Sequence, residues 1–570
     1  MLLGIDVGGT FTDAVIIDGG TIVSSAKRRT TKENLMNGIT DALGAVMSGV
    51  DPAQIEQVTL STTVVTNTIV EHKEQPVDLY VVAGPGRNVD DIFPVRPVYL
   101  KGYTDHRGIV VERTDVKGTH QLANMVQAKS GTDLAAVSAK FGVRNPKEEI
   151  DVAQALSDTY HTISTGSALS GNLNFPRRTI SAYFNSAVAS VFKEFKNAVY
   201  HALDTFHITA PVYILKADGG SLPIDTVESI PVETVFTGPA ATVLGLEALR
   251  STKDVHTVAL DIGGTTTDIS LWKQGKPLMT KEGVSIREYP SAVRSFAVTS
   301  VGIGGESAVR YEDGTLMVGP ERIGPSVALG GTIPTLGDAL IVLGNAHYGD
   351  EQQAYEAIAQ IDTTIDANTM AQRIVDEAVR VVKQGIDTVV AKENKRPIYV
   401  VADIVHPDPF VPAQLVIVGG MAASLGPIIG DQLGLPVHIP ADAAVANAIG
   451  AGVANHTMAI TVHVDTKRRT MVVPELGIQD TGSALRSANA VEEVAYRLLC
   501  EAAQEQGLVA AGVIPDVETI SIEDFPVVDG WQSMERIITV KVQLKAGGER
   551  LCGIIRTVIV CEMKSCRLVQ

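Results

Sequence analysis

The chain has 570 residues, of which 45% are hydrophobic and 20% charged, as expected for a globular protein with several buried cores. Its formal net charge of −18 excludes a general nucleic-acid binder, because contacts to a phosphate backbone require clustered lysine and arginine. The four cysteines, Cys500, Cys552, Cys561 and Cys566, form no CxxC pair, which is typical of a protein from a reducing compartment. Ordinary thiols are favoured over a metal site at Cys561 and Cys566.

No apolar run reaches the length of about 20 residues that spans a bilayer. Asp6 interrupts the apolar start of the chain, which also lacks the basic segment of a secretory signal. We therefore expect a cytoplasmic protein that binds neither membranes nor nucleic acid. The sequence leaves the oligomeric state open, including a homo-oligomer.

The first predicted elements are two short strands joined by a glycine turn. Residues 2–7 form an apolar strand, Gly8, Gly9 and Thr10 form the turn, and residues 13–17 form the second strand. After a second glycine turn, the pattern predicts a strand at 21–27, a helix at 35–47 and strands at 58–60 and 77–82.

The next part of the chain combines irregular and helical patterns. Residues 83–108 are rich in glycine and proline and are expected to be irregular. Residues 151–191 are predicted to be mostly helical, with a loop at 166–178. A strand is predicted at 211–216 and a helix of small residues at 239–249.

The opening pattern then recurs. GIDVGGTFTDAVI at 4–16 and ALDIGGTTTDISL at 259–271 share Asp, an apolar residue, Gly-Gly-Thr and Thr-Asp at the same spacing. The second copy predicts strands at 257–261 and 268–272 around its turn. One copy alone would equally fit a plain hairpin, but an internal repeat indicates two similar α/β lobes that face each other across a cleft.

Each copy has the chemistry of a phosphate clamp. Glycines let consecutive backbone N–H groups approach a phosphate, and threonine hydroxyls add neutral donors. Asp6 and Asp261 end their strands at the cleft, where a carboxylate is a natural ligand for Mg²⁺ or its waters, and we predict both as catalytic residues. The predicted nucleotide contacts are Gly8, Gly9, Thr10, Thr12 and Asp13 in the first copy and Gly263, Gly264, Thr265, Thr266, Thr267 and Asp268 in the second.

A third glycine motif follows in VIVGGMAAS, after both clamps. A strand that ends in Gly419 and Gly420 and opens into a helix at Met421 can lay its backbone against a purine, with a tight strand–helix junction as the plainer alternative. Gly304 and Gly305 are also predicted to contact the nucleotide. The chain contains no Walker motif, GxxxxGK[ST], and its clamp glycines lead into a strand, unlike those of a dinucleotide fingerprint.

Two segments of small residues, at 237–249 and 444–455, are predicted to be helices that cross closely, as a hinge between two lobes requires. The expected fold class is α/β, with two actin/hexokinase-like (ribonuclease H-like) lobes around a nucleotide cleft and a small α+β C-terminal region. The expected units are an N-terminal lobe at 1–210 with an inserted, substrate-facing segment at about 83–150, a second lobe at 211–460, and the C-terminal region at 461–570.

The order of clamp, second clamp and strand-Gly-Gly-helix resembles the superfamily of acetate and sugar kinases, heat-shock protein 70 and actin. Within it, the chain resembles the hydantoinase A/oxoprolinase family over most of residues 1–455. The segments that carry this resemblance are STTVVTNTIVEHK at 61–73, VSAKFGVRNPKEE at 137–149, residues 217–241 and 300–325, and PTLGDALIVLG at 334–344.

The resemblance implies an ATP-dependent cyclic amidase of the hydantoinase or 5-oxoprolinase type. Members of that family phosphorylate the oxygen of a poorly reactive carbonyl, in hydantoins, 5-oxoproline, lactams or ketones, before hydrolysis or carboxylation. The implied cofactors are ATP and Mg²⁺, and the implied partner is a B-type subunit that completes the reaction. This chain is shorter than the long oxoprolinase-type chains and differs from them in its C-terminal region, which leaves its substrate open.

Further site residues follow from the segments that resemble the family. Asp218 is predicted as a third catalytic group, lining the cleft near the transferred phosphate. Asn67, Arg144, Asn145 and Glu306 are expected to shape the substrate pocket, with helix caps or turns as the alternative.

A second divalent metal is implied because relatives in the family can carry one near the substrate. Asp105 and His106 are the predicted ligands, with His72 as a further candidate. Neighbouring residues of a strand point to opposite faces, so a solvated loop is the alternative.

Three other functions fit the same architecture. A small-molecule kinase would release a stable phosphorylated product without a partner. The family-like segments disfavour an actin-like filament protein or a chaperone-type ATPase. An iron–sulfur activator ATPase is disfavoured because no cysteine lies near the predicted lobe interface.

Overall fold

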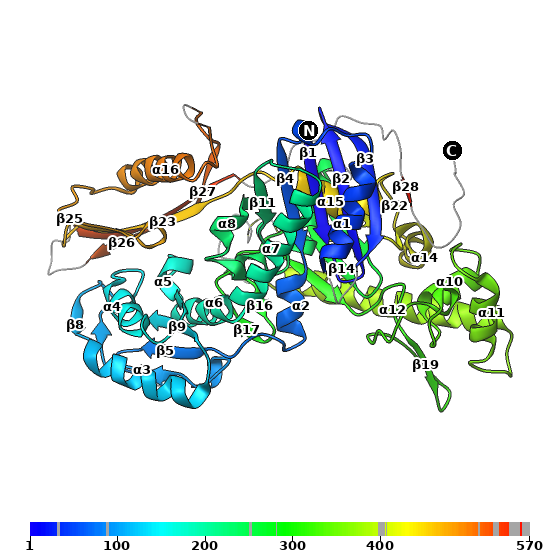
Figure 1. Ribbon diagram of the computed structural model, residues 1–570, viewed down its shortest axis with the longest axis horizontal. Helices are drawn as coiled ribbons and strands as arrows, with labels where there is room; N and C mark the ends of the chain where they lie inside the picture. The colour runs from blue at the N-terminus through cyan, green and yellow to red at the C-terminus, as the bar shows by residue number, and fades with distance from the viewer. Residues whose placement is uncertain are drawn as a thin grey trace.

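The computed structural model describes residues 1–30, 35–86, 90–249, 254–280, 282–396, 405, 407–510, 513–527, 535–545 and 559–560. The N-terminal sheet lies at the centre of an elongated molecule, with the second lobe on one side and the other two units on the opposite side (Figure 1). Cys500 is a free thiol, whereas Cys552, Cys561 and Cys566 lie outside the described residues. No helix in the described ranges is long and apolar enough to cross a membrane.

The first lobe is built on a seven-stranded sheet in the order β12-β11-β4-β1-β2-β3-β28. β1 and β2 are antiparallel, while β1, β4 and β11 run parallel, so the carboxyl ends of these three strands lie at one edge. The strands are β1 (Leu2–Val7), β2 (Phe11–Asp18), β3 (Thr21–Arg29), β4 (Gln57–Thr62), β11 (Val212–Leu215), β12 (Ser221–Pro223) and β28 (Ile559–Val560), and the helices are α1 (Leu35–Val46), α2 (Val64–Val70), α7 (Ala189–Thr205) and α8 (Ile224–Val227).

The central position of β1 in the sheet explains its amino-acid composition. β1 is buried along almost its whole length and therefore has a nearly continuous apolar sequence rather than an alternating one. β11 and β12 follow residue 210, so the first sheet includes two strands from the segment that was expected to begin the second lobe.

The insertion forms a separate four-stranded parallel sheet in the order β10-β9-β5-β6. The sequence predicts the strand at 78–82, whereas the strand at 98–99 lies in a segment expected to be irregular and the strand at 162–165 in one expected to be mostly helical. Its strands are β5 (Asp78–Val82), β6 (Val98–Tyr99), β9 (Leu134–Ala139) and β10 (Thr162–Thr165), with the β7 (Tyr103–Thr104) and β8 (Val110–Glu112) hairpin and helices α3 (Val116–Ser130), α4 (Lys147–Leu156), α5 (Gly166–Leu169) and α6 (Phe175–Ala187).

The second lobe repeats the central arrangement of the first. β13 and β14 form the antiparallel hairpin, and β21 runs parallel to β13 as β4 does to β1. The strands are β13 (Thr257–Ile262), β14 (Thr267–Lys273), β15 (Lys276–Pro277), β18 (Val298–Val301), β19 (Val309–Glu312), β20 (Thr315–Val318), β21 (Gln414–Val418) and β22 (Val437–His438). The intervening hairpin of β16 (Ser285–Ile286) and β17 (Tyr289–Pro290) packs against α6 instead.

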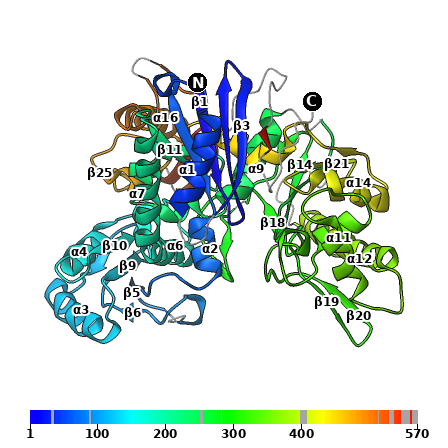
Figure 2. The same cartoon turned by 45° about the vertical axis from the view of Figure 1, so that its right-hand side comes forward.

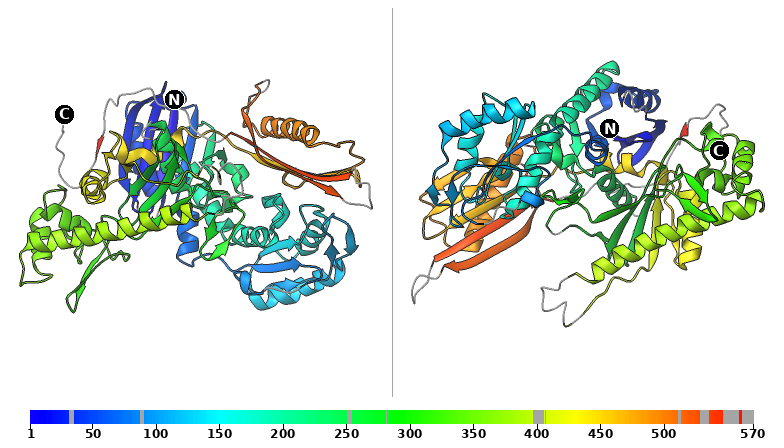
Figure 3. Two further views of the ribbon diagram at one scale, coloured as in Figure 1. Left: turned by 180° about the vertical axis from the view of Figure 1, so that it is seen from behind. Right: turned by 90° about the horizontal axis from the view of Figure 1, so that it is seen from below.

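The helices of the second lobe include one of 28 residues, α12 (Ala367–Asn394), which runs along the outer part of the lobe (Figure 3). The others are α9 (Thr237–Ala248), α10 (Leu336–Val342), α11 (Glu351–Ala359), α14 (Ala422–Leu433) and α15 (Ala446–Gly452). Figure 2 shows the sheet of the first lobe in the middle, with the second lobe on the right and the insertion at the lower left.

The two helices of small residues, α9 and α15, cross closely between the lobes, as their sequences predict. A Cβ atom on Gly245 would lie 2.1 Å from the carbonyl oxygen of Ala446, and one on Gly450 would lie 1.9 Å from that of Ala241. α15 also packs on β1, where a Cβ atom on Gly4 would meet the oxygen of Ala448 at 2.1 Å. Glycine is therefore required at these contacts.

The C-terminal region is a five-stranded antiparallel sheet covered on one face by a helix. The order is β25-β24-β23-β27-β26. Ile460, Val462 and Val464 of β23 point to the apolar face, on which α16 packs. The elements are β23 (Ala459–Asp465), β24 (Thr470–Val473), β25 (Ile478–Thr481), β26 (Val517–Val527), β27 (Glu535–Leu544) and α16 (Ala488–Glu505), which fits the expected α+β composition.

The other face of this sheet is polar and is buried against the insertion. Asp465 forms a bidentate ion pair with Arg107 at 2.6–2.8 Å, and His463 Nε2 bonds the carbonyl oxygen of Gly171 at 2.8 Å. Thr461 and Glu475 extend the same contact, because Glu475 accepts the N–H of Gly171 at 2.9 Å and the Thr461 hydroxyl at 2.8 Å. Burial of so many polar groups fixes this sheet in one orientation on the insertion.

Candidate active site

The two clamps have the same backbone geometry. In the first hairpin, the N–H of Gly8 donates to the oxygen of Phe11 at 3.0 Å, and in the second the N–H of Gly263 donates to the oxygen of Thr266 at 2.9 Å. Asp6 lies directly opposite Asp13 in the first ladder, as Asp261 does opposite Asp268 in the second. The sequence repeat is therefore a repeat in three dimensions, although one N–H of each turn is already bonded within the hairpin.

The two catalytic candidates are brought together by a residue that the sequence does not single out. Asn447, on α15, points its amide nitrogen at Asp6 Oδ2 at 3.4 Å and at Asp261 Oδ2 at 3.3 Å. The hydroxyl of Thr242, on α9, lies 2.6 Å from Asp261 Oδ2 and 2.8 Å from Asn447 Oδ1, and its single proton can be donated to either oxygen. One amide thus joins the carboxylates of both lobes.

The carboxyl groups around this amide carry more negative charge than their surroundings compensate. Burial raises the pKa of Asp6 to about 6, and the charge of Asp13 adds to this effect. Burial and the adjacent Asp261 also raise the pKa of Asp268 to about 6. Lys27 compensates in part, since it forms an ion pair with Asp13 at 2.6 Å and bonds the oxygen of Ala444 in the second lobe at 3.0 Å.

Carboxylate oxygens that have no hydrogen-bond partner at this place suit the coordination of a divalent cation. Asp6 Oδ1 and Asp13 Oδ1 are buried and have no hydrogen-bond partner. Mg²⁺ prefers oxygen ligands and usually takes one or two carboxylates together with waters and substrate phosphates. In the described ranges no preformed group of three or more metal-ligating side chains occurs, so the residues fit an ion held mainly through phosphates rather than a protein cage.

The tips of the two clamps face each other across the lobes. A Cβ atom on Gly264 would lie 3.5 Å from the hydroxyl of Thr10 and 3.5 Å from Glu306 Oε2. Glu306 is buried there between two arginines, Arg29 of the first lobe at 3.4 Å and Arg322 of the second at 2.5 Å. Positive charge is therefore available at the clamp tips from both lobes.

Two of the predicted nucleotide contacts hold loops within their own lobes. Thr12 is fully buried and bonds Thr30 at 3.0 Å, and Thr30 donates to the oxygen of Gly8 at 2.8 Å. Thr267, at the matching position, is also fully buried and donates to the oxygen of Ile303 at 2.7 Å. The structure leaves Thr10, Thr265 and Thr266 as the partly or fully exposed hydroxyls of the clamps.

The remaining glycine motifs surround the second clamp. Gly305 donates to the oxygen of Gly263 at 3.1 Å, and a Cβ atom on Gly304 would lie 2.5 Å from the nitrogen of Thr265. Both glycines are buried, so they support the clamp from behind. Gly419 has φ +94° and approaches Asp261, where a Cβ atom would lie 2.4 Å from Oδ1, while Met421 donates to the oxygen of Ile262 at 3.1 Å and Gly420 is exposed.

Asn67 and Asp218 lie at the carboxyl edge of the first sheet. A Cβ atom on Gly9 would lie 3.4 Å from Asn67 Nδ2, which places this amide beside the first clamp. Asp218 is 4% exposed and accepts the N–H of Gly220 at 3.0 Å. Although burial alone would raise its pKa, Lys216 and Arg294 hold the pKa of Asp218 below its ordinary value.

Arg144 and Asn145 lie elsewhere, between the insertion and the C-terminal sheet. Asn145 donates to the oxygen of Gly108 at 3.0 Å and accepts from Gln479 at 3.2 Å. Arg144 is near His463, and burial followed by that positive charge lowers the pKa of His463 to about 3. These two residues thus contribute to the docking of the C-terminal sheet.

The structure does not assemble the predicted second metal site. Asp105 Oδ1 accepts the N–H groups of Arg107 and Ile109 at 2.9 and 2.8 Å, so this carboxylate shapes a turn, and His106 is exposed. His72 bonds Arg287 at 2.5 Å. Within the described residues, no group of three or more ligating side chains occurs, and the second metal site stays a prediction.

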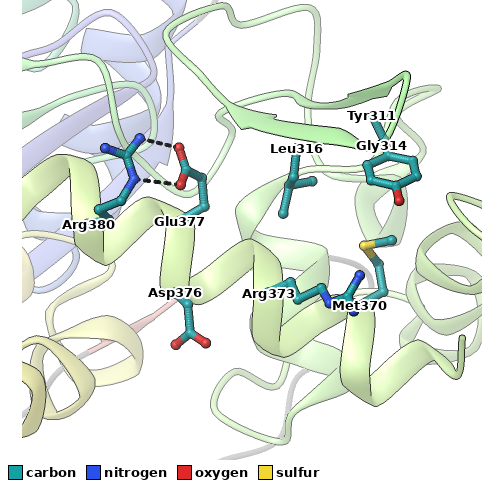
Figure 4. A pocket seen from close by; sticks show the side chains of 8 residues that line it. All are labelled: Tyr311, Gly314, Leu316, Met370, Arg373, Asp376, Glu377 and Arg380. Atoms are coloured by element: carbon teal, nitrogen blue, oxygen red, sulfur yellow. Dashed lines mark hydrogen bonds and ion pairs between the residues drawn. The ribbon is translucent and has the colours of Figure 1, made fainter.

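A surface hollow of about 330 Å³ lies between α12 and the β19–β20 hairpin (Figure 4). It is lined mainly by charged residues of α12, among them Arg373, Asp376 and Glu377. None of the predicted site residues lines it. Glu377 is already paired with Arg380 at 2.5 Å, so part of its charge is used locally.

Replacing Asn447 with alanine is expected to lower nucleotide turnover about 10- to 100-fold, since hydrogen bonds to charged groups contribute about 1.5–3 kcal/mol. Without the amide, the carboxylates of Asp6 and Asp261 repel each other directly. Steady-state ATP hydrolysis would measure the loss. Asn455→Ala, an exposed position just beyond the same helix, is the matched control, and equal rates in the two variants would contradict the bridging role.

The matches to known families cover both lobes. Residues 178–460 match the hydantoinase/oxoprolinase model, and residues 2–160 match the hydantoinase/oxoprolinase N-terminal region. The chain belongs to the hydantoinase/oxoprolinase family. The resemblance noted from the sequence is thereby confirmed.

Curated relatives of this family member include subunits of larger enzymes. Caprolactamase subunit alpha of Pseudomonas jessenii is 26% identical over 381 residues, which are 60% of this chain and 54% of that protein. Acetophenone carboxylase gamma subunit of Aromatoleum aromaticum is 25% identical over 535 residues, 84% of this chain and 70% of that protein. The chain spans about half the length of the first and 24% of 5-oxoprolinase 1 of Arabidopsis thaliana.

Two solved structures share the fold of this family member. Nucleotide-free acetone carboxylase has a TM-score of 0.70 at 16% identity, covering 95% of this chain and 87% of that chain. ATP-dependent caprolactamase from Pseudomonas jessenii has a TM-score of 0.67 at 20% identity, with the same coverage of 95% and 87%. These likenesses confirm the predicted α/β fold class.

Proposed function

We propose that this chain is the ATP-binding subunit of an enzyme that activates a carbonyl compound, a cyclic amide above all, by phosphoryl transfer before hydrolysis. The observation that carries the proposal is the convergence of Asp6 and Asp261 on the single amide of Asn447, between two facing phosphate clamps. Family membership and the ATP-dependent caprolactamase among the similar structures support the same chemistry.

Phosphoryl transfer depends on positioning and charge compensation more than on covalent catalysis. The clamp tips would hold the phosphates through the free N–H groups and exposed hydroxyls of Thr10, Thr265 and Thr266. Mg²⁺ held by Asp6 and Asp261 would neutralise charge on the phosphates. Closure of the lobes around α9 and α15 would exclude water from the transferred group.

Arg29 and Arg322 are expected to bind the phosphates, because both cations lie at the clamp tips, where they pair with Glu306. Arg29→Gln should raise the KM for ATP about 10- to 150-fold, with a smaller change in kcat, since hydrogen bonds to charged groups contribute about 1.5–3 kcal/mol. Arg310→Gln is the control, because Arg310 is exposed and pairs with Glu321. An unchanged KM for ATP in Arg29→Gln would remove this arginine from the site.

A B-type partner subunit is proposed to complete the reaction, because caprolactamase alpha and acetophenone carboxylase gamma are themselves subunits. The test measures ADP release by the purified chain with Mg²⁺, ATP and a panel of hydantoins, lactams and 5-oxoproline, with and without that partner. Stimulation by a cyclic amide is the expected result. Absence of nucleotide binding in calorimetry would refute the proposal, and a stable phosphorylated product formed without a partner would establish the kinase alternative.

A second candidate substrate is a ketone that is carboxylated after activation. The alignment with acetophenone carboxylase gamma subunit over 84% of this chain favours including it. The same assay with acetone or acetophenone and bicarbonate distinguishes a ketone substrate from a cyclic amide. If the substrate is a ketone, ketones stimulate ATP hydrolysis and cyclic amides do not.

A further inference from the structure

Five charged side chains gather where the first lobe meets the C-terminal sheet, at the end of β11. We call this group the Glu233 cluster, and its members are Lys216, Asp218, Glu233, Arg294 and Lys541. Lys216 Nζ lies 3.4 Å from Asp218 Oδ2, and the N–H of Ala217 donates to the carbonyl oxygen of Glu233 at 2.9 Å. Three members are therefore fixed on adjoining backbone of the first lobe.

The other two members come from different units of the chain. The N–H of Phe296 donates to the oxygen of Ala217 at 3.4 Å, which places Arg294 beside the turn, and Arg294 also bonds the side chain of Gln543. Lys541 lies two residues before Gln543 on β27, so both point to the polar face of the C-terminal sheet. In Figure 1, β27 runs from the outer end of the molecule toward β11.

The cluster retains hydrogen-bonding capacity that the protein does not use. Within the described ranges, no hydrogen bond joins the carboxylate of Glu233 or the ammonium group of Lys541 to another residue, and both side chains are partly exposed. Thr457 is fully buried beside Gly220, and its hydroxyl also has no partner. One buried hydroxyl and two partly exposed groups of opposite charge are thus available to a polar ligand at this place.

The electrostatics of the cluster suit proton transfer near neutrality. Burial raises the pKa of Glu233 to about 7, with Asp218 adding to the rise and Lys216, Lys541 and Arg294 opposing it. Burial also lowers the pKa of Lys541. Glu233 can therefore accept a proton while cationic groups remain beside it.

The position of the cluster matches that of an acceptor for the transferred phosphate. β1, β4 and β11 run parallel, so Asp6 and the cluster lie at the same edge, two strand spacings apart. Neighbouring strands are about 4.8 Å apart, which gives about 10 Å between the ends of β1 and β11. A cyclic amide held at the cluster would therefore lie at the same edge of the sheet as the first clamp.

We propose that a cyclic amide binds at the Glu233 cluster, with Glu233 as the acceptor of the amide proton and with Lys541 and Arg294 as donors to the substrate. This inference rests on the proposed function, since ATP supplies the phosphoryl group. The amide oxygen attacks the γ-phosphorus, the bond from that phosphorus to the β–γ bridging oxygen breaks, and ADP leaves. The N–H proton passes to Glu233, and the product is an O-phosphorylated imidate with a C=N bond.

The test compares Glu233→Gln with wild type in amide-stimulated ATP turnover and in ATP affinity. Loss of a general base costs about 100- to 10,000-fold, so stimulation should fall by at least about 100-fold while calorimetric ATP affinity stays unchanged. In wild type, stimulated turnover should decline as the pH falls through about 7, and this acidic limb should be absent from the residual activity of the variant. Lys541→Gln should chiefly raise the KM for the amide.

Matched controls are Glu228→Gln, which removes a surface partner of Lys196, and Lys545→Gln, an exposed lysine just beyond β27. Both should retain stimulation and the wild-type pH profile. Full stimulation with an unchanged acidic limb in Glu233→Gln would overturn the inference and leave the proposed function intact. If no cyclic amide stimulates the wild-type protein that binds ATP, the proposed function fails and the inference fails with it.

Discussion

Substituting asparagine for Asp6 or Asp261 should reduce ATP turnover at least about 100-fold, as loss of a preorganised electrostatic group at a reaction centre commonly does. The two carboxylates flank the Asn447 amide at 3.4 and 3.3 Å, so either substitution removes one of the two charges that would hold Mg²⁺. Single-turnover hydrolysis with saturating Mg²⁺ and ATP measures the chemical step. Wild-type rates in both variants would refute the catalytic assignment.

The same Asp6→Asn variant should be more stable to heat than wild type in the absence of nucleotide. The folded-state pKa of about 6 lies above the ordinary 3.8, so ionisation of Asp6 opposes folding as the pH rises through that interval. Two pKa units correspond to about 3 kcal/mol, an upper limit for the gain above pH 6. A lower melting temperature at pH 7.5 would indicate that Asp6 is structural rather than catalytic.

Replacing Gly450 with alanine should destabilise the contact between the lobes by about 1–3 kcal/mol or more, as overpacking does in a close-packed core. The added Cβ atom would lie 1.9 Å from the oxygen of Ala241 and 2.6 Å from the nitrogen of Gly245, and both are backbone atoms that cannot rotate away. α9 and α15 must therefore separate, which moves Thr242 and Asn447 away from Asp261. The melting temperature and the rate of ATP turnover should both fall.

Gly44→Ala provides the control for this substitution. Gly44 also lies in a helix, α1, but its Cβ atom would meet only the ring of Phe206 at an ordinary 3.6 Å. Because alanine favours helix by about 1 kcal/mol over glycine, this variant should be as stable as wild type or more so. An equal loss of stability in both variants would show that the close crossing of α9 and α15 is not the cause of the loss in Gly450→Ala.

The clamps could be predicted because local sequence determines them. A glycine turn between two apolar strands specifies its own hairpin, and the predicted strand at 2–7 coincides with β1. Of the strands in the insertion, β5 is predicted at 77–82, but the others could not be predicted in the same way. β9, with the sequence LAAVSA, has no alternation and contains three alanines, and it becomes a strand through parallel pairing with β5 and β10.

The sequence predicts only those residues of the candidate site that occur in a recognisable motif. Asp6 and Asp261 could be predicted because they hold the same position in the two copies of the clamp motif. Asn447 belongs to no repeated motif, and its role arises only when α15 packs between the lobes. Thr12 and Thr267 repeat as faithfully as the aspartates, yet both are buried and support loops. Repetition in sequence therefore identifies shared geometry, and the side-chain direction decides which repeated residues face the cleft.

The close crossing of α9 and α15 has a mechanical consequence for the C-terminal sheet. α15 ends at Gly452 and β23 begins at Ala459, so a short connection joins the helix between the lobes to the sheet that carries Lys541. Along this connection Ser221 donates to the oxygen of Asn455 at 2.9 Å, which also ties it to β12. The position of the C-terminal sheet is thus fixed by the same helix that carries Asn447, so a substitution that displaces α15 is expected to disturb the Glu233 cluster as well as the nucleotide site.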